Sequence, residues 1–171
     1  METSQGNITL ELDKAKAPKT VENFLSYVDE GFYNGTIFHR VMKDFMIQGG
    51  GFTPDMKRKK THDPVQNEAK NGLKNKRGSI AMARTNKPHS ATTQFFINHK
   101  DNEFLDYPAR DNWGYCVFGK VVEGMDVVDA IANQKIRKKS NPPNIPETTI
   151  LIEKVSVVSD IPKTPSSLSV Q

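Results

Sequence analysis

Short apolar runs separated by turn residues constrain the fold of this chain more than any other feature of its sequence. The runs occupy residues 7–12, 36–51, 78–83, 94–98, 115–122 and 149–158. In the first, Ile8, Leu10 and Leu12 alternate with polar residues, which is the period of a strand with one buried face. Run 36–51 is long enough for two strands, and its closing glycines indicate a sharp change of direction. The pattern predicts a mainly β protein.

Two segments carry the period of an amphipathic helix instead. Pro18 suits a first helical turn, where no amide hydrogen is needed, and Gly31 suits the end of that helix; the second helix is predicted at 125–133. The apolar residues that share a face are Val21, Phe24, Leu25 and Val28 in the first helix, and Val127, Val128 and Ile131 in the second. Many strands with only two helices favour a closed sheet, since closure removes exposed edges and helices can cover the open ends.

Irregular segments separate these elements. Residues 52–77 are rich in Lys, Asn, Gly and Pro and show neither period, so we expect a long surface loop there, and a second loop at 141–146. A length of 171 residues suits one domain, which we place at 1–160. The remainder, 161–171, has too few apolar residues to pack and is predicted to be a flexible tail.

The composition argues against several classes of protein. The N-terminal residues build no secretory signal, and no stretch reaches the ~20 apolar residues of a membrane span. The single cysteine, Cys116, cannot form a disulfide within the chain. We therefore expect a cytoplasmic protein without membrane contact. The formal charge is +4 and the sequence pI is about 9.1, but the basic runs at 57–60 and 135–139 lie in predicted loops, so we expect no nucleic-acid binding.

The common catalytic signatures are missing from the sequence. There is no Gly-x-Ser-x-Gly nucleophile motif, and the histidines at positions 39, 62, 89 and 99 lack metal-ligand spacing. The glycines at 49–51 lack the spacing of a phosphate loop. The acidic residues lie mainly in polar segments, away from the apolar surroundings that paired catalytic carboxylates need. We expect neither a metal nor a cofactor.

One apolar run contains polar side chains that need an explanation. Within 38–50, Arg40, Met46 and Gln48 share one strand parity among apolar neighbours. A buried guanidinium is costly without partners, so Arg40 should face a cleft or a carboxylate. An ion pair on a barrel face is the structural alternative for Arg40, and core packing is the structural alternative for the apolar residues of these runs.

Five motifs follow one another in order along the chain. They are FHRVMKDFMIQGG at 38–50, GSIAMAR at 78–84, QFFI at 94–97, FLD at 104–106 and VFGKV at 117–121. In sequence and spacing they resemble the signature of the cyclophilin-type peptidyl-prolyl cis-trans isomerases, and the resemblance runs from about residue 6 to residue 158. It is greatest with bacterial cytosolic members. The resemblance implies an isomerase that assists protein folding and a closed eight-stranded antiparallel β-barrel capped by two α-helices.

The resemblance also implies a site on the outer face of the barrel. Arg40 resembles the catalytic arginine of the family, Gln48 a hydrogen-bonding partner of the substrate, and Phe45 a wall of the proline pocket beside them. The backbones of Ala83 and Arg84 would pair with the bound peptide. The substrate-binding residues implied in this way are Met46, Ala83, Arg84, Phe96, Phe104, Leu105 and Tyr115.

Two of these positions depart from the best-known eukaryotic pattern, since Phe104 replaces a Trp and Tyr115 replaces a His. Without an indole N–H, one donor to cyclosporin is missing, so we expect catalysis to be kept and cyclosporin-type ligands to bind with reduced affinity. Residues 107–113 resemble an insertion of bacterial members. The expected partners are proline-containing peptides and folding proteins, and the expected state is a monomer.

The resemblance and the chemistry of the peptide bond together suggest a mechanism. Rotation about the bond before proline is slow because resonance gives it partial double-bond character, with a barrier of ~18–20 kcal/mol. A hydrogen bond from Arg40 to the prolyl nitrogen becomes available only when the bond twists, and such contacts raise kcat. The main alternative is a non-catalytic proline-peptide binding module or chaperone that uses the same pocket. A basic nucleic-acid-binding domain ranks third.

Overall fold

The computed structural model describes residues 1–159, so the predicted tail at 161–171 lies outside the described residues. Within them the strands are β1 (Glu2–Thr3), β2 (Gly6–Asn7), β3 (Thr9–Leu12), β4 (Thr36–Met42), β5 (Met46–Gly49), β6 (Ser79–Met82), β7 (Phe95–Asn98), β8 (Val117–Glu123) and β9 (Leu151–Lys154). The helices are α1 (Pro18–Asp29) and α2 (Met125–Ala132), and two short 3-10 turns are η1 (Ala69–Asn71) and η2 (Glu103–Leu105). The prediction of a mainly β protein with two helices is confirmed.

The strands form one antiparallel sheet that nearly closes on itself. Their order is β2-β1-β9-β4-β5-β7-β6-β8-β3. Only Ile8 separates β2 from β3, which stand at the two ends of this order, and Ile8 is tied to Met1 by backbone hydrogen bonds of 2.8 and 2.9 Å. The described part of the chain has nine strands rather than the expected eight, because its N-terminal segment is divided into three very short pieces.

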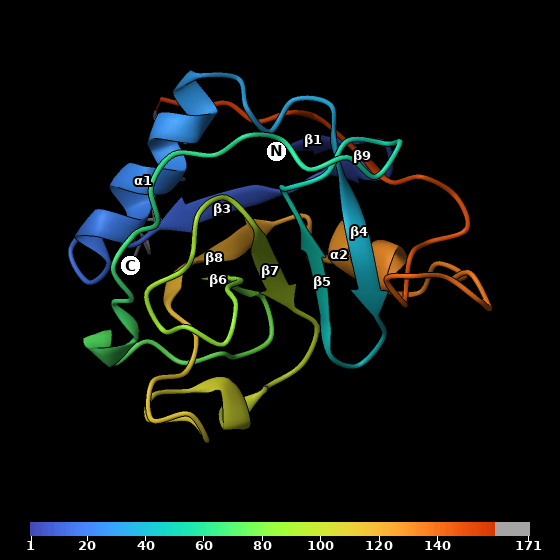
Figure 1. Cartoon of the computed structure of the whole chain (residues 1–171). Coiled ribbons are helices and arrows are strands. Elements are labelled where there is room, and N and C mark those ends of the chain that lie inside the picture. The colour runs from blue at the N-terminus through green and yellow to red at the C-terminus, as the bar shows by residue number, and fades with distance from the viewer. Residues whose placement is uncertain (160–171) are drawn as a thin grey trace, which may run out of the picture.

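The two helices lie on opposite sides of the barrel and complete its core (Figure 1). Val21 and Phe24 of α1 and Ile131 of α2 belong to one buried apolar cluster with the inner residues of the strands. The Phe24 ring lies 5.3 Å from the ring of Phe118 in β8. Each such side chain contributes roughly 1.5–3 kcal/mol when buried. Gly31, with φ of 67°, follows the C-cap residue Glu30 of α1, which is the usual place of a helix-ending glycine.

Alternation along β5 and β7 separates two apolar clusters. Ile47 and Ile97 are paired across these strands and point into the barrel, where they join the large cluster. Their neighbours Met46 and Phe96 point outward and join a second cluster, completed by Ala81, Leu105 and Val117. Successive residues of a strand face opposite sides of a sheet. One pair of strands therefore supplies both the core and an apolar outer surface.

A bulge in β4 decides where Arg40 points. Phe38 and Val41 both lie in the barrel core, which regular alternation over three residues does not permit. The register with β5 shifts between Phe38 and Arg40, leaving His39 as the extra residue. A bulge re-aims the side chains that follow it. Without it Arg40 would share the inward face of Phe38.

The remaining differences from the sequence predictions concern short or irregular segments. The loop at 52–77 contains η1 and two isolated bridges, Phe52–Arg58 and Val65–Ala91, the second of which joins it to a neighbouring loop. The last strand was predicted over 149–158, but β9 covers only Leu151–Lys154. Within the described residues, no helix combines the length and the apolar composition needed to cross a membrane.

Candidate functional site

A pocket of about 310 Å³ opens on the outer face of the barrel, over the second apolar cluster. Its lining consists of Arg40, Phe45, Met46, Gln48, Ala83, Arg84, Phe96, Phe104, Leu105 and Tyr115. These are the ten candidate site residues of the sequence analysis. The structure therefore brings all of them together, although they are scattered over 76 positions of the chain from first to last.

Five parts of the fold, which can be located in Figure 1, supply this lining. Strands β4 and β5 and the turn between them carry Arg40, Phe45, Met46 and Gln48, and the middle of β7 carries Phe96. The segment after β6 carries Ala83 and Arg84, η2 carries Phe104 and Leu105, and Tyr115 stands just before β8. The barrel thus forms the floor of the pocket, and connecting loops form its rim.

The floor of the pocket is apolar and well buried. Met46, Phe96 and Leu105 are only 2%, 4% and 8% exposed. The ring of Tyr115 meets the edge of Phe96 at a centroid distance of 5.7 Å. On the opposite side, Phe45 stacks with Phe104 at 5.8 Å, although Phe104 itself is 64% exposed. This lining can hold a small apolar ring and keep water from it.

Polar groups stand at one rim of the pocket. The Arg40 guanidinium donates from Nη1 to Gln48 Oε1 at 3.3 Å, and Gln48 Nε2 donates to Gln94 Oε1 at 3.0 Å. No carboxylate lies within 4.0 Å of Arg40 among the described residues, and Arg40 is half-buried. Of the two environments expected for Arg40, the structure shows the cleft rather than the ion pair. Its guanidinium keeps donors free to face a bound molecule.

The backbone beside the pocket is only partly free to pair with a peptide. The Ala83 N–H already donates to the carbonyl of Gln94 at 2.9 Å, so the expectation that Ala83 and Arg84 both pair through their backbone needs a restriction. No backbone hydrogen bond within the described residues uses the Arg84 N–H or the Ala83 carbonyl. Those two groups are the ones left for a partner strand.

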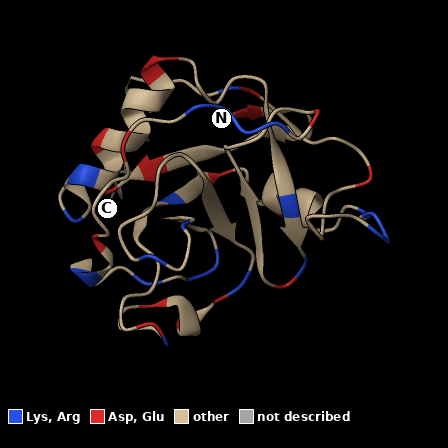
Figure 2. Ribbon diagram, viewed as in Figure 1, with Lys and Arg blue, Asp and Glu red and all other residues tan. Residues whose placement is uncertain are grey.

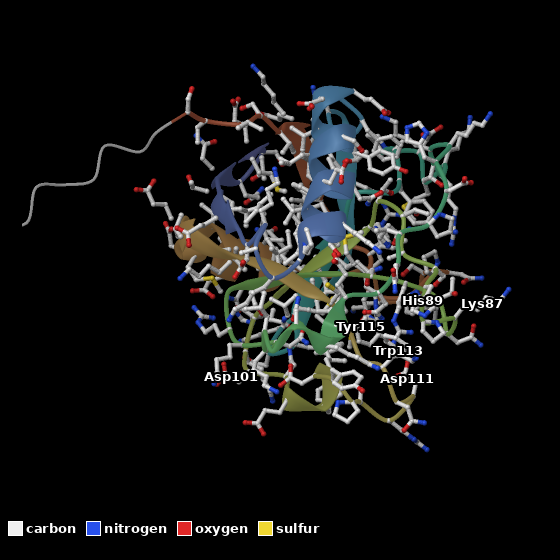
Figure 3. All side chains as sticks on the ribbon, turned by 90° about the vertical axis from the view of Figure 1, so that its left-hand side faces the viewer. Lys87, His89, Asp101, Asp111, Trp113 and Tyr115 are labelled. Carbon is white, nitrogen blue, oxygen red and sulfur yellow. The ribbon has the colours of Figure 1, made fainter. Side chains whose placement is uncertain are left out.

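The Arg84 side chain bonds mainly to the segment that precedes Tyr115, and one further hydrogen bond goes to the carbonyl of Thr85 at 3.0 Å. The Arg84 side chain is 2% exposed, donates to the carbonyl of Gly114 at 2.7 and 3.2 Å, and forms an ion pair with Asp111. Its guanidinium also lies 4.5 Å from the centroid of the Tyr115 ring. Figure 3 shows Asp111, Trp113 and Tyr115 together on one side of the molecule. Arg84 thus fixes the predicted insertion, 107–113, against the pocket.

Asp111 and Gly114 complete this fastening. Hydrogen bonds from the Gly114 N–H and from Arg84 lower the pKa of Asp111 to about 2, so its carboxylate stays ionised. Gly114 has φ of 79°, and a Cβ there would lie 2.6 Å from the carbonyl oxygen of Leu105. Only glycine allows this close approach. The insertion therefore packs directly on the backbone of the pocket wall.

A larger hollow of about 670 Å³ adjoins the pocket and shares Arg40, Gln48, Ala83 and Arg84 with it. Arg58 adds a further positive charge to its lining, which also includes His39 and contains no Asp or Glu. Burial first, and then Arg40 and Arg58, lower the pKa of His39 to about 4, so His39 is neutral at neutral pH. Figure 2 shows that Lys, Arg, Asp and Glu are scattered over many elements of the described chain.

Other candidate chemistry finds no support in the described residues. They hold no group of three His, Cys, Asp or Glu side chains that could ligate a metal ion. Cys116 is buried, and burial raises the pKa of its thiol to about 11, so it is not a ready nucleophile. The pocket itself contains no acid–base pair.

Sequence reasoning missed the residues that support the pocket from behind. Gln94 orients Gln48, and Asn102 donates to the carbonyl of Phe45 at 2.8 Å. Gln94 carried a usable signal, because it is a polar residue at the head of the apolar run 94–97. Asn102 carried none, since an Asn in a loop has no period to mark it.

Comparisons with known proteins point to one family. A family model described as cyclophilin type peptidyl-prolyl cis-trans isomerase/CLD matches residues 1–157. A peptidyl-prolyl cis-trans isomerase of Streptomyces antibioticus is 58% identical over 160 residues, which cover 92% of this chain and 96% of that one. Peptidyl-prolyl cis-trans isomerase B of Escherichia coli is 55% identical over 157 residues, which cover 91% of this chain and 96% of that one.

A solved structure shows the same fold. The crystal structure of a cyclophilin-type isomerase of Cryptosporidium parvum, obtained in the presence of the dipeptide Ala-Pro, superposes with a TM-score of 0.78 at 28% identity. It covers 94% of this chain and 98% of its own. The fold, the family and the enzyme class expected from the sequence are thereby confirmed. The chain belongs to the cyclophilin-type peptidyl-prolyl cis-trans isomerases.

Proposed function

We propose that this chain accelerates rotation about X-Pro peptide bonds by a non-covalent mechanism in which Arg40 stabilises the twisted bond. The proline ring of the substrate occupies the apolar pocket over Met46, Phe96 and Leu105, which matches its size and polarity. The preceding peptide lies across the polar rim. Gln48 and the free backbone groups of Ala83 and Arg84 hold it there.

The observation that carries this proposal is the unpaired guanidinium beside an apolar pocket. Arg40 is half-buried, lacks an acidic partner within the described residues and has one side-chain hydrogen bond, to Gln48. A purely structural arginine would be expected to meet a carboxylate. A donor aimed at the rim can bond the prolyl nitrogen when twisting returns a lone pair to it, which is a contact of the transition state alone.

Arg40 and the pocket would each supply part of the stabilisation of the transition state. An acceleration of about 10⁵-fold requires roughly 7 kcal/mol of selective stabilisation. One well-placed donor supplies about 2.7–4 kcal/mol in comparable sites. The rest has to come from holding the proline ring still while the other side of the bond turns, and from excluding water around it. The buried floor of the pocket suits that role.

The substrates that fit are proline-containing peptides and the exposed loops of folding proteins. The relative from Cryptosporidium parvum was crystallised with Ala-Pro, which has the chemistry that the pocket of this chain would accept. We further propose that residues 1–160 act as one catalytic domain that assists protein folding. Its cytoplasmic compartment and its monomeric state remain predictions from the sequence.

Phe104 determines the proposed response to cyclosporin-type ligands. Its ring is 64% exposed at the rim and offers no N–H donor. The variant Phe104→Trp restores an indole donor at that place. We expect it to bind cyclosporin several-fold more tightly than the wild type. Equal affinities of the two proteins, measured by isothermal titration calorimetry, would contradict this assignment.

A protease-coupled isomerisation assay on a short X-Pro peptide tests the proposed mechanism. We expect wild type to accelerate the reaction strongly and Arg40→Ala to lose about 100-fold or more in kcat/KM while keeping part of its peptide affinity. Arg40→Lys keeps the positive charge but not the planar donor geometry, so it should also lose most of the activity. No acceleration by folded wild-type protein would instead favour a non-catalytic proline-binding module.

A further inference from the structure

The turn between β4 and β5 presents Phe45 to the pocket and is held in an uncommon conformation. Asp44, the residue before Phe45, has φ of 57°. Left-handed backbone is unusual for a residue with a side chain, so it persists only where the surroundings hold it. The side chain of Asp44 is 76% exposed, and its Oδ1 lies 4.0 Å from His99 Nδ1, too far for a hydrogen bond.

His99, which directly follows β7, binds the backbone of this turn at two points. The Asp44 N–H donates to His99 Nδ1 at 2.9 Å, and the His99 N–H donates to the carbonyl of Phe45 at 2.9 Å. The His99 side chain is only 8% exposed. Both peptide groups that flank the Asp44–Phe45 junction are thereby fixed by one residue, with Asn102 as a second donor to the Phe45 carbonyl.

The other ring nitrogen of His99 is anchored to helix α2. His99 Nε2 lies 2.9 Å from Asp129 Oδ1, and Arg77 donates to Asp129 Oδ2 at 2.8 Å and to the His99 carbonyl at 2.9 Å. Arg77 first, and then His99, lower the pKa of Asp129, so the carboxylate accepts both hydrogen bonds. Since Nδ1 accepts from Asp44, the ring must carry its proton on Nε2.

No other histidine of this chain has such an arrangement. His62 and His89 are exposed, and His39 is buried but its Nδ1 has no hydrogen-bond partner. His99 alone is buried with both ring nitrogens bonded. A neutral imidazole with one fixed donor and one fixed acceptor is a rigid spacer of defined direction. Here it spans from α2 to the pocket.

We propose that His99 is a positioning residue, which fixes the Asp44–Phe45 turn through Nδ1 and so sets the place of the Phe45 wall against the substrate proline. The proposal rests on the pocket-wall role of Phe45 in the proposed function. His99 touches no substrate. Its contribution is to keep Phe45 from moving away when the proline ring enters, which makes binding of the substrate tighter.

Two conservative variants separate the two ring nitrogens. The Oδ1 atom of Asn is as many bonds from Cα as His Nδ1, whereas the terminal amide of Gln matches Nε2. His99→Asn therefore keeps an acceptor for the Asp44 N–H, and His99→Gln keeps only the contact with Asp129. His62→Gln, at an exposed histidine paired with Glu30, serves as the matched control.

The measurement is kcat and KM for an X-Pro peptide, corrected for the folded fraction of each variant. We expect His99→Gln to raise KM about tenfold, His99→Asn to recover most of that loss, and His62→Gln to match wild type. A purely structural histidine would lower the folded fraction and leave KM unchanged. Equal KM values for the Asn and Gln variants would overturn the proposal.

A second measurement does not depend on activity or on the folding of a variant. The ¹⁵N NMR shifts of the His99 ring in wild type report which nitrogen carries the proton. We expect a protonated Nε2 and an unprotonated Nδ1, and the opposite tautomer would overturn the proposal. If wild type fails to catalyse isomerisation, the proposed function fails, whereas active wild type with unchanged His99→Gln refutes only the role of His99.

Discussion

Strands β5 and β7 have two buried faces that are built in different ways. Inward, Ile47 and Ile97 meet apolar side chains from every direction, including those of both helices. Outward, Met46 and Phe96 are as apolar and nearly as buried, but loops surround them and leave a pocket. Burial alone therefore does not distinguish a residue of the core from a residue of the binding site. What separates them is whether the surrounding structure closes over the residues.

The two faces also differ in what keeps their shape. Side chains pack together to fill the core, whereas hydrogen bonds have to keep the walls of a pocket apart. Asn98, fully buried, donates to Asn75 Oδ1 at 3.0 Å and to Ser79 Oγ at 2.9 Å, and accepts from Asn102 at 2.8 Å. Asn102 in turn donates to Phe45. Buried polar networks of this kind specify one arrangement of the backbone. The outer face thus depends on hydrogen bonds where the inner face depends on packing.

The largest expected effect comes from truncating neighbouring residues on the two faces. Ile97→Ala and Phe96→Ala should each lower the free energy of unfolding by about 2–5 kcal/mol, because both side chains are buried. Only Phe96→Ala should also raise KM, by about tenfold, since only Phe96 lines the pocket. Urea unfolding and initial rates on the folded proteins measure the two quantities. A similar rise in KM for Ile97→Ala would show that the two faces are not functionally separate.

The bulge residue His39 should show the next largest effect, in the pH dependence of stability. Its pKa is lowered to about 4, mainly by burial, from an ordinary value near 6.5. Between pH 6.5 and 4, His39 is therefore mostly protonated in the unfolded chain and mostly neutral in the folded chain. Stability from this group is fully present above pH 6.5 and falls by about 3 kcal/mol as the pH drops to 4.

A non-titrating variant isolates this contribution. His39→Gln removes the group, so the stability of the variant should fall less steeply between pH 6.5 and 4 than that of wild type. Urea unfolding at several pH values gives both curves. Parallel curves would mean that His39 is not held neutral at the bulge.

A smaller effect is expected where the insertion is fastened to the pocket rim. Asp111→Asn weakens the ion pair with Arg84. Because the Asp111 side chain is partly exposed, this ion pair contributes less than about 1 kcal/mol to the free energy of unfolding. The pKa of Asp111 is lowered to about 2, so its stabilisation is complete above pH 4 and is lost as the pH falls toward 2. We expect a two- to threefold lower kcat/KM and a shallower loss of stability below pH 4. If wild type and Asp111→Asn lose stability equally below pH 4, Asp111 does not stabilise the rim.

Local patterns predicted the inner face of the molecule well. Alternation located β3, and the apolar runs bounded by turn residues located β4 to β9, because a buried strand needs apolar residues over a short length. Strands β1 and β2 were missed, since two residues each carry no period, and η1 and η2 were missed for the same reason. The bulge at His39 was also invisible, because an extra residue in an apolar run leaves the composition unchanged.

The outer face was predicted by resemblance rather than by pattern. Arg40 and Gln48 stood out locally as polar residues in an apolar run, but nothing local joins them to Phe96 or Tyr115. Pairing of β5 with β7 places Gln48 opposite Phe96. The Tyr115 ring then lies 5.7 Å from the ring of Phe96. The supporting residues His99 and Asn102 follow only from three-dimensional hydrogen bonds. Contacts between distant segments leave no mark in a short stretch of sequence.

The central claim is that the pocket binds proline while Arg40 acts on the twisted bond. Exchange NMR on an Ala-Pro peptide measures the rate of cis-trans interconversion on the enzyme when the peptide is saturating. We predict that Arg40→Ala, once saturated, slows interconversion about 100-fold or more relative to wild type. Interconversion at the wild-type rate on saturated Arg40→Ala would contradict the claim, because Arg40 would then contribute to binding alone.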